Sequence, residues 1–273
     1  MIKRSLGAGV RAACVVGLLA APALILNPVG ADGTQVVAFL ALLAGALVFV
    51  EYVSAYPSVI DFRGAPPFNR LRFAGAAVCV LLLTQLLVSL KTGQAGPVVT
   101  IAAVLAQVLD FPFSPVRLLT LVPYPEDVPV VRLAAALAYA LALATVAGFV
   151  VVTRYFDWPL NRGNFNVLTN MPLFDPTTGG DVLARMRRDA QFYLSLGFLL
   201  PFLLPALMRL AAPLVELLSL SEPQMLIWLV AAWAFIPASM AMRGLALLRV
   251  AALIERKRRK AYAQRDEDSL QIA

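Results

Sequence analysis

The chain of 273 residues has no histidine, two cysteines and few charged residues, which make up 14% of it. Without histidine, a His-ligated haem, the usual catalytic zinc sites and Ser-His or Cys-His nucleophile pairs are excluded. The sequence also lacks a GxxxxGK[ST] phosphate loop and a GxGxxG turn. We therefore predict no catalytic residue, no metal ligand and no cofactor.

Long apolar runs dominate what is present. Hydrophobic residues are 60% of the chain, and its mean hydropathy is +0.80. A membrane-spanning helix needs about 20 mainly apolar residues, because lipid cannot satisfy backbone polar groups. Runs of this kind lie at residues 12–29, 35–53, 73–90, 128–152, 192–217 and 225–254. They predict an all-α, polytopic integral membrane protein of about six transmembrane helices, with residues 1–255 forming a single transmembrane domain. The last run is too long for one crossing, so we expect Arg243 and Arg249 to mark its exit from the membrane.

A seventh apolar run, Pro97–Leu109, has only 13 residues and ends at Asp110. This length predicts a re-entrant or interfacial segment. Its two uncharged polar side chains, Thr100 and Gln107, would face water if the segment lined a path through the membrane. We favour a segment that packs against neighbouring helices, and keep Gln107 as a candidate functional position.

The basic residues are distributed very unevenly between the two sides of a six-span arrangement. With the N-terminus on the cytoplasmic side, the cytoplasmic segments together hold 19 Lys and Arg residues, and the outer segments hold four. Lys and Arg accumulate in short cytoplasmic connections. We therefore predict a protein of the bacterial inner membrane with both termini in the cytoplasm. If residues 97–109 also crossed the membrane, one of the two larger basic groups would lie on the outer side.

The first 31 residues fit two interpretations. Lys3 and Arg4, an apolar stretch and the small residues Val29-Gly30-Ala31 resemble a cleavable signal peptide. The sequence Asn27-Pro28-Val29-Gly30 also suits a tight turn between two antiparallel helices, and we favour a retained first span. Cleavage would leave five spans and change nothing downstream.

The C-terminal tail, residues 256–273, is basic at first and then acidic. Arg256–Lys260 directly follow the last span, a position where basic clusters attract anionic lipid headgroups. We therefore predict membrane lipids as partners of this cluster, and no binding of nucleic acid. Residues 261–273 are expected to be a frayed helix end or a disordered tail.

The two predicted inner loops carry most of the candidate functional residues. Both contain a tyrosine, an aspartate, Arg-Gly and Phe-Asn, which include Asp61 and Arg63 in the first loop and Asp157 and Arg162 in the second. A faint internal duplication is one explanation, and chance is the other. Glu51, near the inner end of the second span, is expected to pair with an arginine such as Arg63; a proton or cation site is the alternative.

The second inner loop, residues 154–190, is too rich in aromatic residues to be disordered. We expect a compact lid against the inner face, with Asp181 capping a short interfacial helix that leads into the fifth span. Asp61, Asp157 and Asp181 could hold Mg²⁺ with Asp175, but their spacing matches no known pattern.

Two further features concern packing. Cys14 and Cys79 lie inside predicted spans, where we expect both to be buried thiols without a disulfide. In the fourth span, Ala136, Ala140, Ala144 and Gly148 recur every four residues, with Ala134, Ala138 and Ala142 beside them. Small residues at this spacing favour close helix packing in membranes.

Three classes of function are compatible with these patterns. The absence of catalytic motifs and the Asn- and Pro-rich loops favour a non-catalytic accessory, scaffold or assembly component that binds another membrane protein. The short segment at residues 97–109 favours a small-molecule or lipid transporter, because broken helices often line substrate sites. A lipid-modifying enzyme is the third and least supported class.

Overall fold

The computed structural model describes residues 2–26, 31–56, 58–156, 158–159, 170–171, 181–211, 220 and 222–272. These residues form helices and connections, with no strand among them. The helices are α1 (Ile2–Leu26), α2 (Ala31–Val53), α3 (Phe68–Thr92), α4 (Pro97–Leu109), α5 (Pro115–Leu119), α6 (Val128–Tyr155), α8 (Val182–Ala211) and α9 (Pro223–Ile272). Six of them, α1, α2, α3, α6, α8 and α9, are long and apolar enough to cross a membrane, which confirms the predicted fold class.

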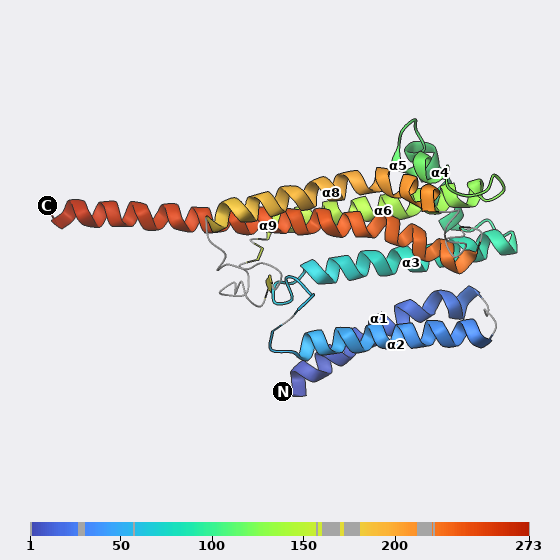
Figure 1. Cartoon of the computed structure of the whole chain (residues 1–273), viewed down its shortest axis with the longest axis horizontal. Helices are drawn as coiled ribbons and strands as arrows, with labels where there is room; N and C mark the ends of the chain where they lie inside the picture. The colour runs from blue at the N-terminus through green and yellow to red at the C-terminus, as the bar shows by residue number, and fades with distance from the viewer. Residues whose placement is uncertain are drawn as a thin grey trace.

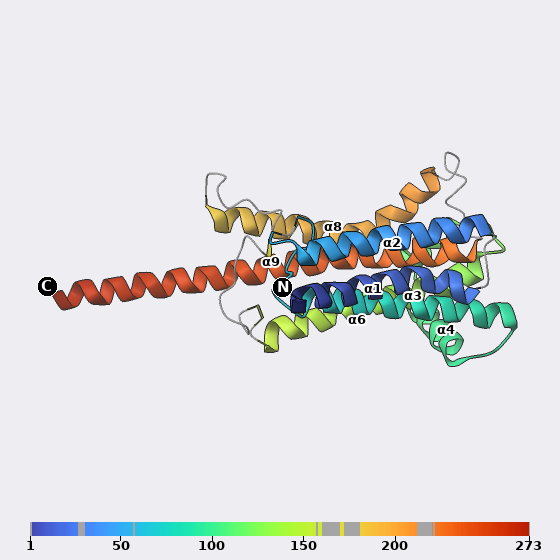
Figure 2. The ribbon, with the colours of Figure 1, turned by 90° about the horizontal axis from the view of Figure 1, so that it is seen from below.

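The six long helices run alongside one another, and both termini lie at the same end of the bundle (Figure 1). We call this end the terminal face. The opposite end carries α4 and α5, and we call it the α4 face (Figures 1 and 2). An even number of crossings brings the termini to one end, as the six-span interpretation of the sequence requires.

Two expectations about helix boundaries were wrong. The interfacial helix at Val182 does not end before the fifth span, because α8 runs without a break from Val182 to Ala211. The tail is neither frayed nor disordered in its backbone, because α9 continues as one helix of 50 residues to Ile272. Helix α9 continues past Arg243 and Arg249, so the exit from the membrane expected at these residues lies within a continuous helix and stays a prediction.

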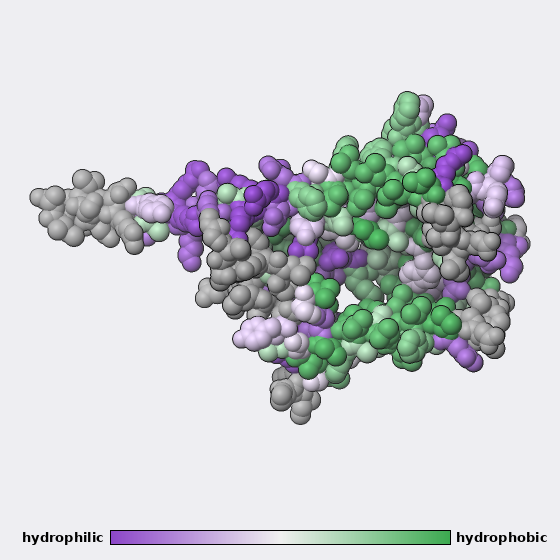
Figure 3. Space-filling view, in the orientation of Figure 1, coloured by the Kyte–Doolittle hydropathy of each residue, from purple (hydrophilic) through white to green (hydrophobic). Residues whose placement is uncertain are grey.

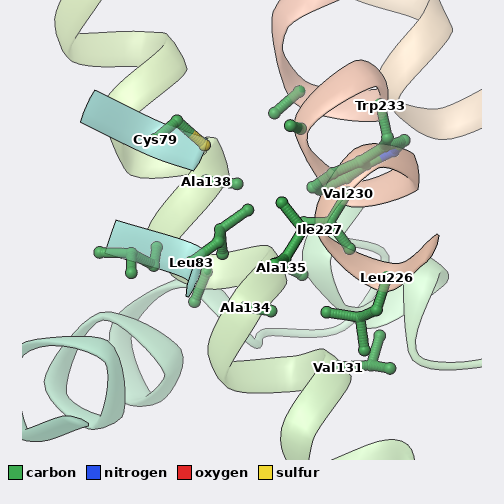
Figure 4. Packing of buried hydrophobic residues seen from close by; sticks show 14 of the residues in the cluster. Cys79, Leu83, Val131, Ala134, Ala135, Ala138, Leu226, Ile227, Val230 and Trp233 are labelled. Atoms are coloured by element: carbon green, nitrogen blue, oxygen red, sulfur yellow. The ribbon is translucent and has the colours of Figure 1, made fainter. Parts of the chain in front are cut away.

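The main core lies between α3, α6 and α9. Cys79 and Leu83 of α3 face Ala135 and Ala138 of α6, and Ile227 of α9 closes the cluster (Figure 4). On α6 the fully buried small residues are Ala134, Ala135, Ala136, Ala138 and Ala142. The face of α6 that carries the four-residue repeat from Ala136 to Gly148 is only partly covered, since Ala144 is exposed. The packing seam is thus the neighbouring row of alanines.

Helices α8 and α9 make close backbone contacts at two glycines. A Cβ atom added to Gly197 would lie 2.7 Å from the Ala241 nitrogen, and one added to Gly244 would lie 2.8 Å from the Ala190 oxygen. Contacts this short leave no space for any side chain. Glycine at these two positions therefore allows the two backbones to touch, as is common between membrane helices.

The α1–α2 hairpin is attached to the rest of the bundle by one of its two helices. Helix α1 contacts α3 and α9, whereas α2 contacts α1 and no other described element. Apolar side chains such as Phe39, Leu42 and Leu47 leave α2 exposed. In the space-filling view the hairpin forms a separate hydrophobic band, with an opening between it and the bundle (Figure 3).

Candidate functional site

The connection between α2 and α3, which we call the α2–α3 linker (residues 54–67), is folded around Glu51. The carboxylate of Glu51 accepts hydrogen bonds from the backbone nitrogens of Ser58, Val59 and Ile60, at 3.1, 3.2 and 3.2 Å, and from the Ser58 hydroxyl. This carboxylate therefore organises backbone groups that would otherwise lack partners. These contacts support neither the expected pairing of the Glu51 carboxylate with an arginine side chain nor a cation site at Glu51.

Arg63 has a complementary role at the end of α2. Its guanidinium donates to the carbonyl oxygens of Glu51, Ser54 and Ala55, the last two at 2.9 and 3.2 Å. The final carbonyls of a helix have no partners within the helix, and a cation there is favourable. Arg63 thus bonds the backbone of Glu51 rather than its side chain, and together they hold the linker against α2.

Asp61 lies in the α2–α3 linker at the terminal face and is buried. Its carboxylate forms an ion pair with Arg243 of α9 at 2.9 Å, and Arg72 of α3 lies near enough to interact with it electrostatically. Burial raises the pKa of the Asp61 carboxyl above its ordinary value, and the two guanidiniums oppose this rise. The carboxylate ties the linker to two spans.

The two arginines around Asp61 are held by further contacts. The guanidinium of Arg243 lies over the ring of Tyr193 of α8, 4.3 Å from its centre. Arg72 donates to the Ser239 hydroxyl at 3.3 Å and to the Asn69 side-chain oxygen at 3.4 Å. Cation–π contacts and charge-assisted hydrogen bonds fix such groups in place.

The second inner loop is anchored to the first at two described points. Trp158 is fully buried, and its indole nitrogen donates to the Ala65 oxygen at 3.0 Å. The Asn170 side-chain oxygen accepts from the Gly64 nitrogen at 2.8 Å, and its carbonyl accepts from the Phe62 nitrogen at 2.6 Å. These contacts agree with the expected lid for the described part of the loop.

Aromatic rings fill the space beneath these anchors. The Trp158 ring lies 5.4 Å from Phe62 and 5.1 Å from Phe149, and Phe68 lies 4.8 Å from Phe62. Such tilted and edge-on pairs add stability beyond the burial of their area. The two loops that share a sequence pattern are therefore packed together through their aromatic residues, and the terminal face has its own hydrophobic core.

A cleft separates the α1–α2 hairpin from α3 and α9, and we call it the hairpin cleft. Its volume is about 470 Å³. Apolar side chains line most of it, and its polar residues are Arg11, Tyr52, Asn69, Arg70, Arg72 and Ser239. Cys14 is among the lining residues and is exposed, so its expected burial was wrong, whereas Cys79 is buried as expected. Both cysteines are free, as predicted.

At the α4 face, Asp110 forms ion pairs with Arg117 and with Arg132, the latter at 3.1 Å. A hollow of about 320 Å³ lies beside them between α4 and α6, and Gln107 is one of its lining residues. Thr100 and Gln107 are both exposed, whereas Ala102 and Ala106 form the face of α4 that packs against α6. The polar residues are therefore not part of the packed face that we favoured for this segment.

The structure brings Glu51, Asp61 and Arg63 together at the terminal face and leaves Gln107 at the opposite end. Asp157 and Arg162 lie outside the described residues.

Asp181 caps α8 as expected: its carboxylate accepts from the Leu183 nitrogen at 3.2 Å and pairs with Arg258 at 3.2 Å. The hydrogen bond from Leu183 and then the contact with Arg258 lower the pKa of Asp181. Among the described residues, no group of three or more acidic or cysteine side chains could hold a metal ion.

Sequence reasoning missed Arg72, Tyr193, Arg243 and Asn170. Arg72 and Arg243 were counted as topology signals or as helix exits, because each stands near the end of an apolar run. Asn170 was grouped with other loop asparagines. A useful signal was the position of Arg243, well before the dense basic cluster that begins at Arg256, because a charge within an apolar run needs a partner or a route to water.

Comparison with known protein families, with curated proteins and with solved structures finds no match to this chain. The fold and the site therefore define a class, a polytopic helical membrane protein with an ordered terminal face, and no relative assigns a role to any residue.

Proposed function

We propose that this protein is a non-catalytic accessory or scaffold component of a larger membrane complex. In this proposal it lies in the bacterial inner membrane with the terminal face in the cytoplasm, where 19 of the 23 basic residues then lie. The observation that carries the proposal is the C-terminal part of α9. Residues 260–272, which we call the docking arm, extend as a helix away from the bundle (Figures 1 and 2).

The base of the docking arm is braced by the start of α8. Arg187 pairs with Glu255 at 2.5 Å, and Arg258 pairs with Asp181 at 3.2 Å. From Arg259 to Ile272 the helix rises by about 20 Å at roughly 1.5 Å per residue. A straight helix braced in this direction leaves the membrane surface within a few turns. Anionic headgroups can therefore reach Arg256 and Lys257, and we propose that the distal part meets a protein.

Packing energetics also favour a protein partner. Most helical stability in proteins comes from packing of one face of the helix against another surface. The side chains of Lys260, Tyr262 and Gln264 are exposed. A partner that covers this arm would supply the missing packing, and the ordered loops of the terminal face would provide a firm base beside it.

The proposal is tested by removing the docking arm alone. A stop codon at position 260 keeps Arg258 and Glu255, and hence both bracing ion pairs. We expect full-length protein, extracted in a mild detergent, to carry another protein in stoichiometric amount, and the truncated protein to lose it while keeping the same thermal stability. A full-length protein that purifies as a homo-oligomer alone would contradict the proposal.

Photo-crosslinking in native membranes provides a matched comparison of position. A photoreactive phenylalanine at Tyr262 should give one discrete protein adduct. The same residue at Phe198 of α8, which is similarly exposed within a span, should give none. Equal protein adducts at both positions would show non-specific contact.

A small-molecule or lipid transporter remains the second candidate, and the hollow beside Gln107 favours it. A cysteine at Gln107 or Thr100 should then react with small polar thiol reagents, and its modification should reduce uptake without lowering protein abundance. If the introduced cysteine reacts but its modification does not change uptake, the position is exposed to water only. This result would count against transport through this segment.

A further inference from the structure

The hairpin cleft combines an apolar interior with cations at one end. Its deeper wall is formed by Val15, Val48, Phe73 and Phe235, at positions within the spans. Its end near the terminal face carries Arg11 of α1 and Arg70 and Arg72 of α3. This division matches a molecule with a hydrocarbon chain and an anionic head.

The cations at this end exceed the acids that pair with them. Asp61 offers one carboxylate to both Arg72 and Arg243. Among the described residues, no carboxylate forms an ion pair with Arg11 or Arg70. The nearby carboxylate of Glu51 is occupied by the backbone nitrogens of the α2–α3 linker. The mouth of the cleft therefore has an excess of positive charge.

Two of the three arginines, Arg11 and Arg72, are held in position by other contacts. Arg11 donates to the Gly7 oxygen and lies 4.6 Å from the centre of the Tyr52 ring. Arg72 is held by Ser239 and Asn69. Guanidinium groups fixed in this way retain further N–H donors, which match phosphate oxygens in geometry.

The hairpin cleft can be reached from the side of the molecule. Helix α2 packs only on α1 among the described helices, and the opening between hairpin and bundle is visible in the space-filling view (Figure 3). A lipid could therefore enter with its chain first and without crossing a polar barrier. An apolar opening of this size within a bilayer is favourably filled by hydrocarbon.

We propose that the hairpin cleft binds one anionic phospholipid of the surrounding leaflet, with its phosphate between Arg11 and Arg70 and an acyl chain between the hairpin and the α3–α9 pair. Arg72 supplies further positive charge at the headgroup. This site is separate from the docking arm, and it does not depend on the proposed function.

The native Cys14 allows a direct test, because it lines the hairpin cleft and is exposed, whereas Cys79 is buried and serves as an internal control. The full-length protein is placed in nanodiscs of phosphatidylcholine, with or without phosphatidylglycerol. We expect phosphatidylglycerol to slow the reaction of Cys14 with a maleimide. Equal rates in the two lipid mixtures would overturn the proposal, and so would equal protection by inorganic phosphate, which would show a site for the free anion.

Charge-removing variants locate the headgroup. In native mass spectrometry, Arg11→Gln and Arg70→Gln should each weaken retention of phosphatidylglycerol by about fivefold, the effect of one cation near a lipid surface. The matched control removes one charge from the basic tail, at Arg256→Gln, where headgroups are attracted without a cleft, and should weaken the retention of phosphatidylglycerol much less than either cleft variant. Thermal unfolding of each variant checks that it is folded. An equal loss in the control would show general attraction to the basic tail and contradict the cleft.

Discussion

The indole nitrogen of Trp233 in α9 donates a hydrogen bond to the backbone oxygen of Pro201 in α8, at 3.0 Å. In a regular helix that oxygen would accept from the nitrogen of residue 205, which is a proline and has no N–H. Trp233 thus supplies the donor that the sequence of α8 removes. An unpaired carbonyl is especially costly where lipid excludes water, and neighbouring helices commonly satisfy such groups.

Replacing Trp233 by Phe should lower the free energy of unfolding by about 1–3 kcal/mol, because it leaves this buried carbonyl without a donor. The measurement is reversible unfolding in mixed detergent micelles. Trp228→Phe, on the same helix and partly buried, is the matched control and should cost less.

A double-mutant cycle isolates the hydrogen bond from the packing of the indole ring. In a Pro205→Ala background, residue 205 can donate to the Pro201 oxygen, so Trp233→Phe should cost less than it does in the wild type. An unchanged cost would show that Trp233 acts through packing alone.

The ion pair between Asp61 and Arg243 should make stability depend on pH when it is broken. Arg243→Gln leaves a buried carboxylate with only Arg72 nearby, and should lower stability at pH 7 by about 3 kcal/mol. Because burial raises the folded-state pKa of Asp61, stability in this variant is greatest below the unfolded pKa and is lost as the pH rises through the folded pKa.

The double variant Arg243→Gln/Asp61→Asn should recover most of the loss at pH 7 and should lose the pH slope, since no buried charge then remains unpaired. Thermal unfolding between pH 4 and 8 measures both effects. A double variant as unstable as Arg243→Gln would show that Arg243 stabilises the bundle mainly through its contact with Tyr193.

The close contact of α8 and α9 should not tolerate a methyl group at Gly197. The added Cβ would lie 2.7 Å from the Ala241 nitrogen and 2.8 Å from the Pro237 oxygen, and a backbone cannot yield as a side chain can. Gly197→Ala should therefore cost about 1–3 kcal/mol in unfolding free energy. Gly148→Ala in α6 meets nothing within 4 Å and should be neutral or slightly stabilising through helix propensity.

The lid should open when its tryptophan anchor is removed. Trp158→Ala deletes a fully buried side chain and its hydrogen bond to Ala65, at a cost of about 3 kcal/mol. If the loss is local, protease added to inside-out vesicles should cut at Arg162 roughly a hundredfold faster than in the wild type. Tyr155→Ala, at an exposed neighbouring position, should leave cleavage unchanged.

In the wild type, cleavage in the basic tail at residues 256–265 should precede cleavage at Arg162. Equal rates at the two positions in the wild type would show that the anchors at Trp158 and Asn170 do not order the intervening chain.

The proposed orientation in the membrane is tested by thiol labelling of intact cells. In a background with Cys14→Ala and Cys79→Ala, a cysteine at Gly93 on the α4 face should react with an impermeant maleimide, and one at Gln264 of α9 should react only after permeabilisation. Labelling of Gln264 in intact cells would place the terminal face outside and reverse the proposal.

The pattern of apolar runs was sufficient to predict the class of fold and the number of spans. Each run must satisfy its own backbone hydrogen bonds in lipid, so length and composition alone identify a spanning helix. The same reasoning separated Pro97–Leu109 from the spans and placed both termini at one end. The length and composition of a span are local to its segment, and the direction of crossing alternates from one span to the next.

The terminal face depended on contacts between distant segments, which no local pattern specifies. Asp61 was visible as a loop acid, but its partner Arg243 lies on the last helix of the chain. Glu51 and Arg63 were correctly placed near each other, yet each bonds backbone groups that become available only once α2 has ended and the linker has folded back. Which of the two rows of alanines on α6 forms the packing seam likewise depended on the positions of the neighbouring helices.

Sequence by itself thus determined which segments enter the membrane, because the free energy of insertion is a sum over the residues of each segment. Only the tertiary structure decided which polar groups meet. The pairing of Trp233 with Pro201, the anchoring of Trp158 on Ala65 and the position of Cys14 in a cleft all follow from how the helices pack. That packing arises from shape and from hydrogen bonds between segments, since lipid removes the hydrophobic drive that would otherwise favour contact along any apolar face.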